Sequence, residues 1–253
     1  CIDCGTCIAV CPYKNISIVD GKFEVSNECI RCHQCLNINY GCLYYDSIKG
    51  SKNMKKLPGI NKYLSVGVEK YWIENYLEDS TYEPGNRKTD TMFGFLTDAG
   101  ITEKRELTPF GEFVKNKGVE KDEIWALMLC NLAYTTVFNW YVHNVPFNET
   151  YYREKMELDF GDRVTQRAKN EFWNAFKTML DTMDNFQNIG VGTPDITRKL
   201  MRTGEERKTL NSIYRTAWRN PDPRVILYSL YKFAENCGEY YTFTLTRLMN
   251  NEI

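Results

Sequence analysis

The stretch CIDCGTCIAVCP, residues 1–12, and the stretch CIRCHQCLNINYGC, residues 29–42, decide how the beginning of this chain folds. The first has the spacing C-x2-C-x2-C-x3-C-P, and the second has C-x2-C-x2-C-x6-C. Eight of the ten cysteines in the 253-residue chain lie in these two stretches. Such a density in so short a segment indicates that bound metal, rather than apolar burial, organises it.

Three cysteines at successive x2 spacing favour an iron–sulfur cluster, because that spacing wraps three thiolates around one corner of a cubane. Pro12 follows the fourth cysteine and suits the first turn of a short helix. Zinc is the main alternative, since C-x2-C pairs also suit zinc. Disulfides would require an oxidising compartment, for which nothing else in the sequence argues. His33 lies inside the second stretch, where a solvated loop residue is favoured over a ligand.

The segment 1–48 closely resembles the bacterial two-cluster ferredoxins. The resemblance implies two [4Fe-4S] clusters held by crossed sets of ligands. The implied sets are Cys1, Cys4, Cys7 and Cys42 for one cluster, and Cys29, Cys32, Cys35 and Cys11 for the other. A hairpin is expected between the two cysteine stretches, because ISIVDGKFEV at residues 16–25 alternates around Asp20-Gly21, a favourable two-residue turn.

Two features depart from the ferredoxin pattern. Cys42 ends a C-x6-C spacing and is followed by Leu43, whereas the ferredoxin pattern has C-x3-C followed by proline. Cys1 is the first residue, whereas a ferredoxin has a strand before its first cysteine. We therefore expect this chain to be a fragment of a protein that continues upstream.

Composition excludes several classes of protein. A mean hydropathy of −0.49 and the absence of an apolar run approaching ~20 residues argue against a transmembrane helix. No signal peptide opens the chain, and a cytoplasmic location is expected. The formal net charge of −1 supplies no global attraction to nucleic acid or to an anionic membrane.

The predicted fold class is α+β, with a ferredoxin-type domain at residues 1–48 and a mainly α-helical domain at residues 60–253. KGSKNMKKLPG at residues 49–59 is predicted to be a linker. Residues 124–142 are apolar on most faces and predict a buried helix. Pro221 and Pro223 are expected to begin another helix. Residues 162–187 place one apolar stripe at helical spacing: Val164, Ala168, Phe172, Phe176, Met179 and Met183.

Residues 60–118 have the outline of a winged-helix module. Two helices are expected in residues 60–77 with a turn at Gly67, then a helix ending at Gly100, a short strand at Glu106-Leu107, and a helix from Thr108-Pro109. Residues 50–118 contain eleven Lys or Arg against ten Asp or Glu, so no basic stripe marks a nucleic-acid interface. DNA contact is a candidate here, and a helical core with protein contacts is the favoured alternative.

Four runs of the chain resemble an uncharacterised bacterial domain: KGSKNMKKLPGINKYLSVGVEKYWIENYL, ELTPFGEFV, WALMLCNLAYTTVFNWYVHNVPF and LYKFAENCGEYYTFTLTRLMNNEI. That domain is found beside or fused to phosphoadenosine-phosphosulfate-reductase-like proteins, often in DNA-modification and phage-defence islands. The resemblance implies an oxidoreductase whose catalytic domain lies upstream or on a partner reductase, with a role in DNA sulfur modification or phage defence.

The chain itself shows no catalytic constellation. GVGTP at residues 190–194 lacks the lysine of a phosphate-binding loop and predicts a turn. The lone His143 is expected to be packed, and Cys130 and Cys237 to be inert buried thiols. The leading hypothesis is an electron-transfer module. The alternative is a DNA- or protein-binding subunit in which the clusters are structural or act as sensors.

Overall fold

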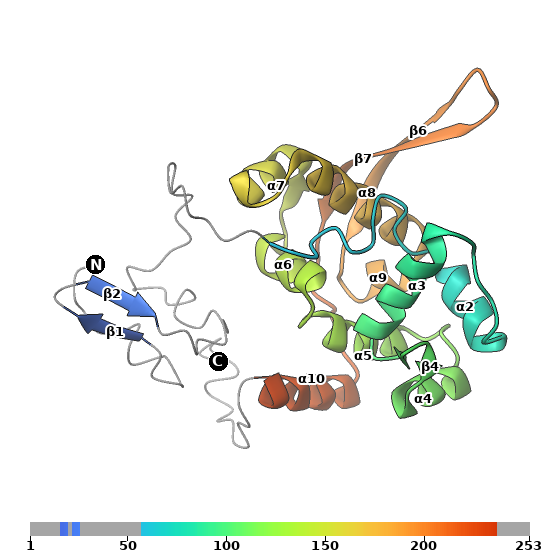
Figure 1. The fold of residues 1–253 in the computed structure, drawn as a ribbon, viewed down its shortest axis with the longest axis horizontal. Helices are drawn as coiled ribbons and strands as arrows, with labels where there is room; N and C mark the ends of the chain where they lie inside the picture. Colours follow the sequence, from blue (N-terminus) through green and yellow to red (C-terminus); the bar gives the residue numbers. More distant parts are fainter. Residues whose placement is uncertain (1–15, 20–21, 26–56, 237–253) are drawn as a thin grey trace. The chain divides into compact units, whose positions relative to one another are not determined.

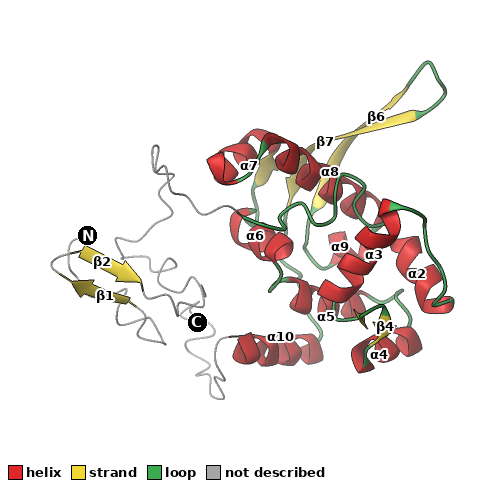
Figure 2. Cartoon of the chain, in the orientation of Figure 1, coloured by secondary structure: helices red, strands yellow, loops and turns green. Residues whose placement is uncertain are grey.

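A computed structural model of the chain describes residues 16–19, 22–25 and 57–236 (Figure 1). The chain divides into two units, one comprising Cys1–Ser51 with Phe233–Ile253 and the other Lys52–Lys232. We call the second the helical unit. The fold is mixed α and β, as Figure 2 shows, with several helices and three small antiparallel sheets in the described ranges.

The helices of the described residues are mostly short. They are α2 (Lys70–Glu78), α3 (Arg87–Asp98), α4 (Pro109–Lys117), α5 (Asp122–Leu132), α6 (Thr136–Asn144), α7 (Arg153–Phe160), the 3-10 turn η2 (Gly161–Arg163), α8 (Gln166–Thr182), α9 (Asp184–Asn188) and α10 (Pro223–Asn236). The start of α10 at Pro223 confirms the prediction made from the two prolines.

The described strands pair only with antiparallel neighbours. They are β1 (Ile16–Val19), β2 (Lys22–Val25), β3 (Thr102–Glu103), β4 (Glu106–Leu107), β5 (Thr150–Tyr152), β6 (Thr193–Leu200) and β7 (Glu206–Tyr214). The pairs β1–β2 and β3–β4 are separate hairpins, and the third sheet has the order β5-β7-β6. That third sheet was not predicted from the sequence.

Helix α8 is the central element of the core. The side-chain oxygen of Thr165 accepts a hydrogen bond from the backbone N–H of Ala168 at 3.3 Å, which satisfies a donor of the first turn. The predicted apolar stripe is confirmed, because its members are buried except for Ala168, which is partly buried against the same core. The helix is shorter than predicted, since Met183 interrupts it before α9 begins.

Aromatic side chains fill the space between α8 and its neighbours. The ring of Tyr141 stacks on Phe176 with centroids 4.1 Å apart, and Trp140 stacks on Phe160 at 3.9 Å. Phe138 lies edge-on or tilted to several rings, including Phe176 at 5.4 Å. Such offset and edge-to-face pairs add to the apolar burial that stabilises the core.

The prediction of one helix over residues 124–142 was wrong. The chain leaves the helix after Leu132 and starts α6 at Thr136. The hydroxyl of Thr135 donates to the carbonyl of Leu132 at 2.6 Å, and the side-chain amide of Asn139 donates to the carbonyl of Ala133 at 3.1 Å. These side chains compete with the helical hydrogen bonds and stabilise the break.

The prediction of a helix from Ile60 was also wrong, because residues 58–66 form turns and the first helix within the described residues begins at Lys70. Gly67 has φ +64°, and a Cβ there would approach the carbonyl oxygen of Ala175 to 2.6 Å. The backbone therefore lies directly on α8. The hairpin ending at Leu107 and the helix starting at Pro109 agree with the sequence prediction.

Thr108 connects this hairpin to α4 and caps the N-terminus of that helix. Its contribution to stability can be tested by substitution. Its hydroxyl oxygen accepts from the N–H of Gly111 at 2.9 Å and donates to the carbonyl of Gly100 at 2.6 Å. Thr108→Ala is expected to lower the free energy of unfolding by about 1–2 kcal/mol, because both groups lose a partner. Denaturant titration measures the change. Thr216→Ala, at an exposed loop position, is the control, and an equal effect of both substitutions would contradict the capping role.

Candidate functional site

The predicted cluster ligands lie outside the residues that the structure describes. This holds for all eight cysteines of the two stretches: Cys1, Cys4, Cys7, Cys11, Cys29, Cys32, Cys35 and Cys42. Cys237 and most of the predicted linker lie outside the described residues as well. Within those described, no group of three or more His, Cys, Asp or Glu side chains could hold a metal ion.

The hairpin predicted between the two cysteine stretches is present. Strands β1 and β2 pair antiparallel, with Ile16 opposite Val25 and Val19 opposite Lys22, so the connection has two residues. Ile16 is buried whereas Ser17 and Val19 are exposed, which is the alternation expected of a strand with one covered face. The strand lengths and the turn length therefore agree with the sequence prediction.

Cys130 and His143 of the helical unit were both predicted to be packed in the core, and only Cys130 is partly buried. Cys130 is partly buried in α5, and burial raises the pKa of its thiol to about 11, which makes the reactive thiolate scarce at neutral pH. His143 was expected to be packed, but it is exposed in the last turn of α6, where its Nδ1 lies 2.8 Å from the carbonyl oxygen of Asn139. The raised pKa of Cys130 is the opposite of what a reactive thiol requires.

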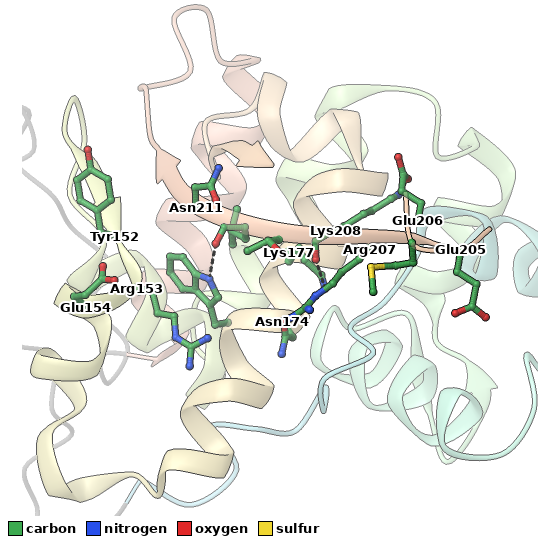
Figure 3. A pocket seen from close by; sticks show the side chains of 14 residues that line it. Tyr152, Arg153, Glu154, Asn174, Lys177, Glu205, Glu206, Arg207, Lys208 and Asn211 are labelled. Atoms are coloured by element: carbon green, nitrogen blue, oxygen red, sulfur yellow. Dashed lines mark hydrogen bonds and ion pairs between the residues drawn. The ribbon is translucent and has the colours of Figure 1, made fainter. Parts of the chain in front are cut away.

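An open groove of about 910 Å³ lies between α8 and strand β7, next to the junction of β5 and α7 (Figure 3). Its lining combines cations, carboxylates, amides and an exposed tyrosine, and contains neither cysteine nor histidine. The polar side chains are Tyr152, Arg153, Glu154, Asn174, Lys177, Glu205, Glu206, Arg207, Lys208, Thr209 and Asn211. This groove can therefore bind a ligand through charged and hydrogen-bonding side chains, and its lining contains no redox-active thiol.

Two side chains of α8 attach the helix to β7 along this groove. The indole Nε1 of Trp173 donates to the carbonyl of Leu210 at 3.1 Å, and the Nζ of Lys177 donates to the carbonyl of Lys208 at 3.4 Å (Figure 3). Burial lowers the pKa of Lys177, the nearby Asp181 opposes this, and the cations Lys208 and Arg207 lower it further. A bound anion would favour the charged form of Lys177.

Asp181 joins α8 to both strands of the β6–β7 hairpin. Its carboxylate accepts from the Nζ of Lys208 at 2.6 Å and from the guanidinium of Arg198. The side chain of Asp181 is 8% exposed, so water screens these contacts weakly. The hairpin is therefore fixed to α8, at its Arg198–Lys208 pair, by one carboxylate that contacts two cations.

Arg215 is a buried cation near the other end of β7. Its Nη1 donates to the carbonyl oxygens of Val145 at 2.5 Å and Val142 at 3.3 Å, and its Nε donates to Gly190 at 3.4 Å. The two valine carbonyls lie at the C-terminal end of α6, where the helix dipole favours positive charge. Arg215 thus connects α6, the residues before β6 and the end of β7.

The sequence did not predict the groove, because β5, β6 and β7 were not expected. ERKTLNSIY at residues 206–214 contains the β-branched residues Thr209 and Ile213 and the aromatic Tyr214, and this composition is the signal that could have indicated a strand. Among the described helices, none is long and apolar enough to cross a membrane. Comparison with protein-family models, with curated proteins and with solved structures finds no match to this chain.

Proposed function

We propose that this chain is an iron–sulfur electron-transfer module that binds two [4Fe-4S] clusters. The observation that carries the proposal is the pair of four-cysteine stretches, at residues 1–11 and 29–42. The β1–β2 hairpin supports it, because a hairpin with a two-residue turn is what the ferredoxin resemblance implies between two such stretches. The spacing of three thiolates at x2 intervals fits a cubane better than it fits zinc.

The donor set fits this cofactor in number and in kind. The proposed ligands are Cys1, Cys4, Cys7 and Cys42 for one cluster, and Cys29, Cys32, Cys35 and Cys11 for the other. When bound, such clusters supply the transfer of single electrons. The residues of the chain contribute thiolates, and a reducing compartment such as the cytoplasm keeps those thiolates from forming disulfides.

The proposal places the substrate chemistry outside this chain. The resemblance to proteins fused to phosphoadenosine-phosphosulfate-reductase-like domains suggests an upstream catalytic domain, or a partner reductase, that exchanges electrons with this module. A role in DNA sulfur modification or phage defence follows from the same resemblance.

For the two parts of the chain we propose a ferredoxin-type fold in residues 1–48 and a winged-helix-like fold in residues 60–118. In the second, the order α2, α3, the β3–β4 hairpin and α4 supports the proposal. The hairpin has only two residues in each strand, with Thr102 opposite Leu107. Such a short wing would reach less far than a typical DNA-contacting wing, which favours protein contact over DNA contact there.

Anaerobic metal analysis tests the cofactor. The purified chain is expected to contain about eight iron and eight acid-labile sulfide, because each cubane takes four thiolates and the two stretches supply eight. Cys130→Ala is the matched control and should keep the full iron content, since Cys130, in α5, is not one of the eight proposed ligands. Stoichiometric zinc without labile sulfide would contradict the proposal.

The alternative function is a DNA- or protein-binding subunit whose clusters are structural or act as sensors. A protruding basic hairpin, β6–β7, favours this alternative. Fast, reversible one-electron reduction and reoxidation in the presence of the upstream domain supports electron transfer. Clusters that never reoxidise in that mixture would support the structural role instead.

A further inference from the structure

The β6–β7 hairpin projects from the helical unit as an arm (Figures 1 and 2). We define the arm as residues 197–209, which comprise the distal parts of the two strands and the turn between them. Leu200 near its tip is 74% exposed, and most other arm residues are exposed too. Because most of its side chains are exposed to solvent, the arm contributes little to the core, and those side chains can contact a ligand.

Two successive cross-strand pairs of the arm bring like charges together. Arg198 lies opposite Lys208, and Lys199 lies opposite Arg207. Residues directly opposite in an antiparallel pair share a face, and successive pairs alternate between faces. The arm therefore has one cationic pair on each face. Like charges in directly opposite positions destabilise a hairpin unless an anion lies close to them.

On one face, the protein itself supplies that anion. Asp181 of α8 accepts from both Arg198 and Lys208, so we call this the inner face. On the outer face, neither Lys199 nor Arg207 forms an ion pair within the described ranges of the chain. Both side chains are exposed. The outer face thus has two adjacent cations, neither of which forms an ion pair with a carboxylate of the described residues.

The rest of the outer face is suited to a polar ligand. Thr197 and Thr209 lie opposite each other beside the cationic pair. The side-chain amide of Asn211 donates to the hydroxyl of Thr197 at 2.8 Å and to the carboxylate of Asp195 at 3.2 Å. The exposed Met201 lies beyond the cationic pair, at the turn, and its backbone N–H donates to the carbonyl of Glu205 at 2.8 Å. Between this turn and Asn211 the outer face presents charged and polar groups, which suit a charged, polar ligand.

We propose that the outer face of the arm binds the phosphodiester backbone of duplex DNA, with Lys199 and Arg207 each contacting a phosphate. A two-stranded antiparallel ribbon has dimensions that the major groove of B-form DNA admits. Hydroxyl and amide groups beside the cations can add hydrogen bonds to phosphate oxygens. Arg207 also lines the groove next to α8, where cations and carboxylates alternate, so the proposed contact is confined to the arm.

This site is independent of the clusters and is separate from the winged-helix-like segment. The test uses the full chain and a 20-base-pair fluorescent duplex, with binding measured by anisotropy at several salt concentrations. Lys199→Gln/Arg207→Gln is expected to weaken binding about tenfold or more, and to reduce the slope of log K against log salt by about two. Its melting temperature should be unchanged or higher, because the repulsion across the hairpin is removed.

The matched control is Lys115→Gln/Lys117→Gln, which removes two exposed lysines from α4 in the winged-helix-like segment. This variant should bind DNA as the unmodified chain does. An equal or larger loss in the control would place the interface on α4 and overturn the proposal, as would unchanged binding by the arm variant. The iron content of each variant is measured in parallel, so that failure of the cluster proposal remains distinguishable.

Two further probes test the class of partner. An RNA duplex of the same sequence should bind more weakly, because the major groove of A-form RNA is too deep and narrow for the ribbon. A polyglutamate peptide of equal charge should also bind more weakly. Equal binding of the RNA duplex would overturn insertion into a DNA groove, and equal binding of polyglutamate would identify an acidic protein as the partner instead.

Discussion

Arg215→Met is expected to lower the free energy of unfolding of the helical unit by about 3 kcal/mol or more. Methionine keeps much of the packing volume but removes the donors that satisfy the carbonyls of Val142, Val145 and Gly190. Arg215 is 5% exposed, so water cannot replace these hydrogen bonds without rearrangement. The guanidinium also lies 4.1 Å from the ring centroid of Phe147, a cation–π contact that is lost as well.

Denaturant titration followed by tryptophan fluorescence measures this effect. Arg219→Met, at an exposed position four residues later, is the matched control and should change stability by less than about 0.5 kcal/mol. Arg215→Lys should fall between the two, because an ammonium keeps the charge but lacks the planar fork of donors. Equal midpoints for Arg215→Met and Arg219→Met would show that the buried contacts contribute no stability.

Cys11→Ala is expected to reduce the iron content from about eight to about four per chain, and to remove the cluster assigned to the other cysteine stretch. The reason is the proposed crossed ligation, in which Cys11 completes the set of Cys29, Cys32 and Cys35. The electron paramagnetic resonance spectrum of the Cys11→Ala variant, recorded with its remaining cluster reduced, should therefore match that of the Cys32→Ala variant. Cys4→Ala, in the same stretch as Cys11, should give a different spectrum.

The helical unit provides an internal control for this experiment. Its core, built around Phe138 and α8, contains no proposed ligand, so its cooperative thermal transition should persist in all three cysteine variants. A spectrum of Cys11→Ala that matches Cys4→Ala would contradict crossed ligation. Loss of both clusters with an intact helical transition would contradict the expectation that each ligand set can be filled independently.

Local patterns in the sequence predicted several elements of this fold. The alternation around Asp20-Gly21 predicted the β1–β2 pairing, because turn chemistry and side-chain period both act within ten residues. Thr108-Pro109 predicted the start of α4, and the four-residue spacing of Phe172 and Phe176 predicted the buried face of α8. In each case the interactions that form the element connect residues that are close in sequence.

Elements that depend on distant partners were not predicted. Strand β5 is only three residues long and exists because Tyr151 pairs with Ile213, which lies far along the chain. Strand β6 is exposed over most of its length, so its composition carries no apolar alternation. The break between α5 and α6 comes from Thr135 and Asn139, whose side chains satisfy backbone carbonyls within an otherwise apolar stretch.

The same distinction applies to the candidate sites. Cysteine spacing predicts a donor set because metal ligation imposes its own local geometry on residues 1–42. The groove beside α8 and the basic pairs of the arm arise from strand register, and a shift of one residue would place Lys199 and Arg207 on different faces. Charge counts along the sequence could therefore not indicate them.

The place of β6 in its sheet has a consequence for the protein at high concentration. In the order β5-β7-β6, the strand β6 is an edge, and an exposed edge can pair with a strand of another molecule. Arg198 and Lys199 point to opposite faces near its end, so a second copy added alongside would meet positive charge on both sides. The arm is thereby protected against edge-to-edge assembly into fibres, and this protection would be lost if both cations were replaced by apolar residues.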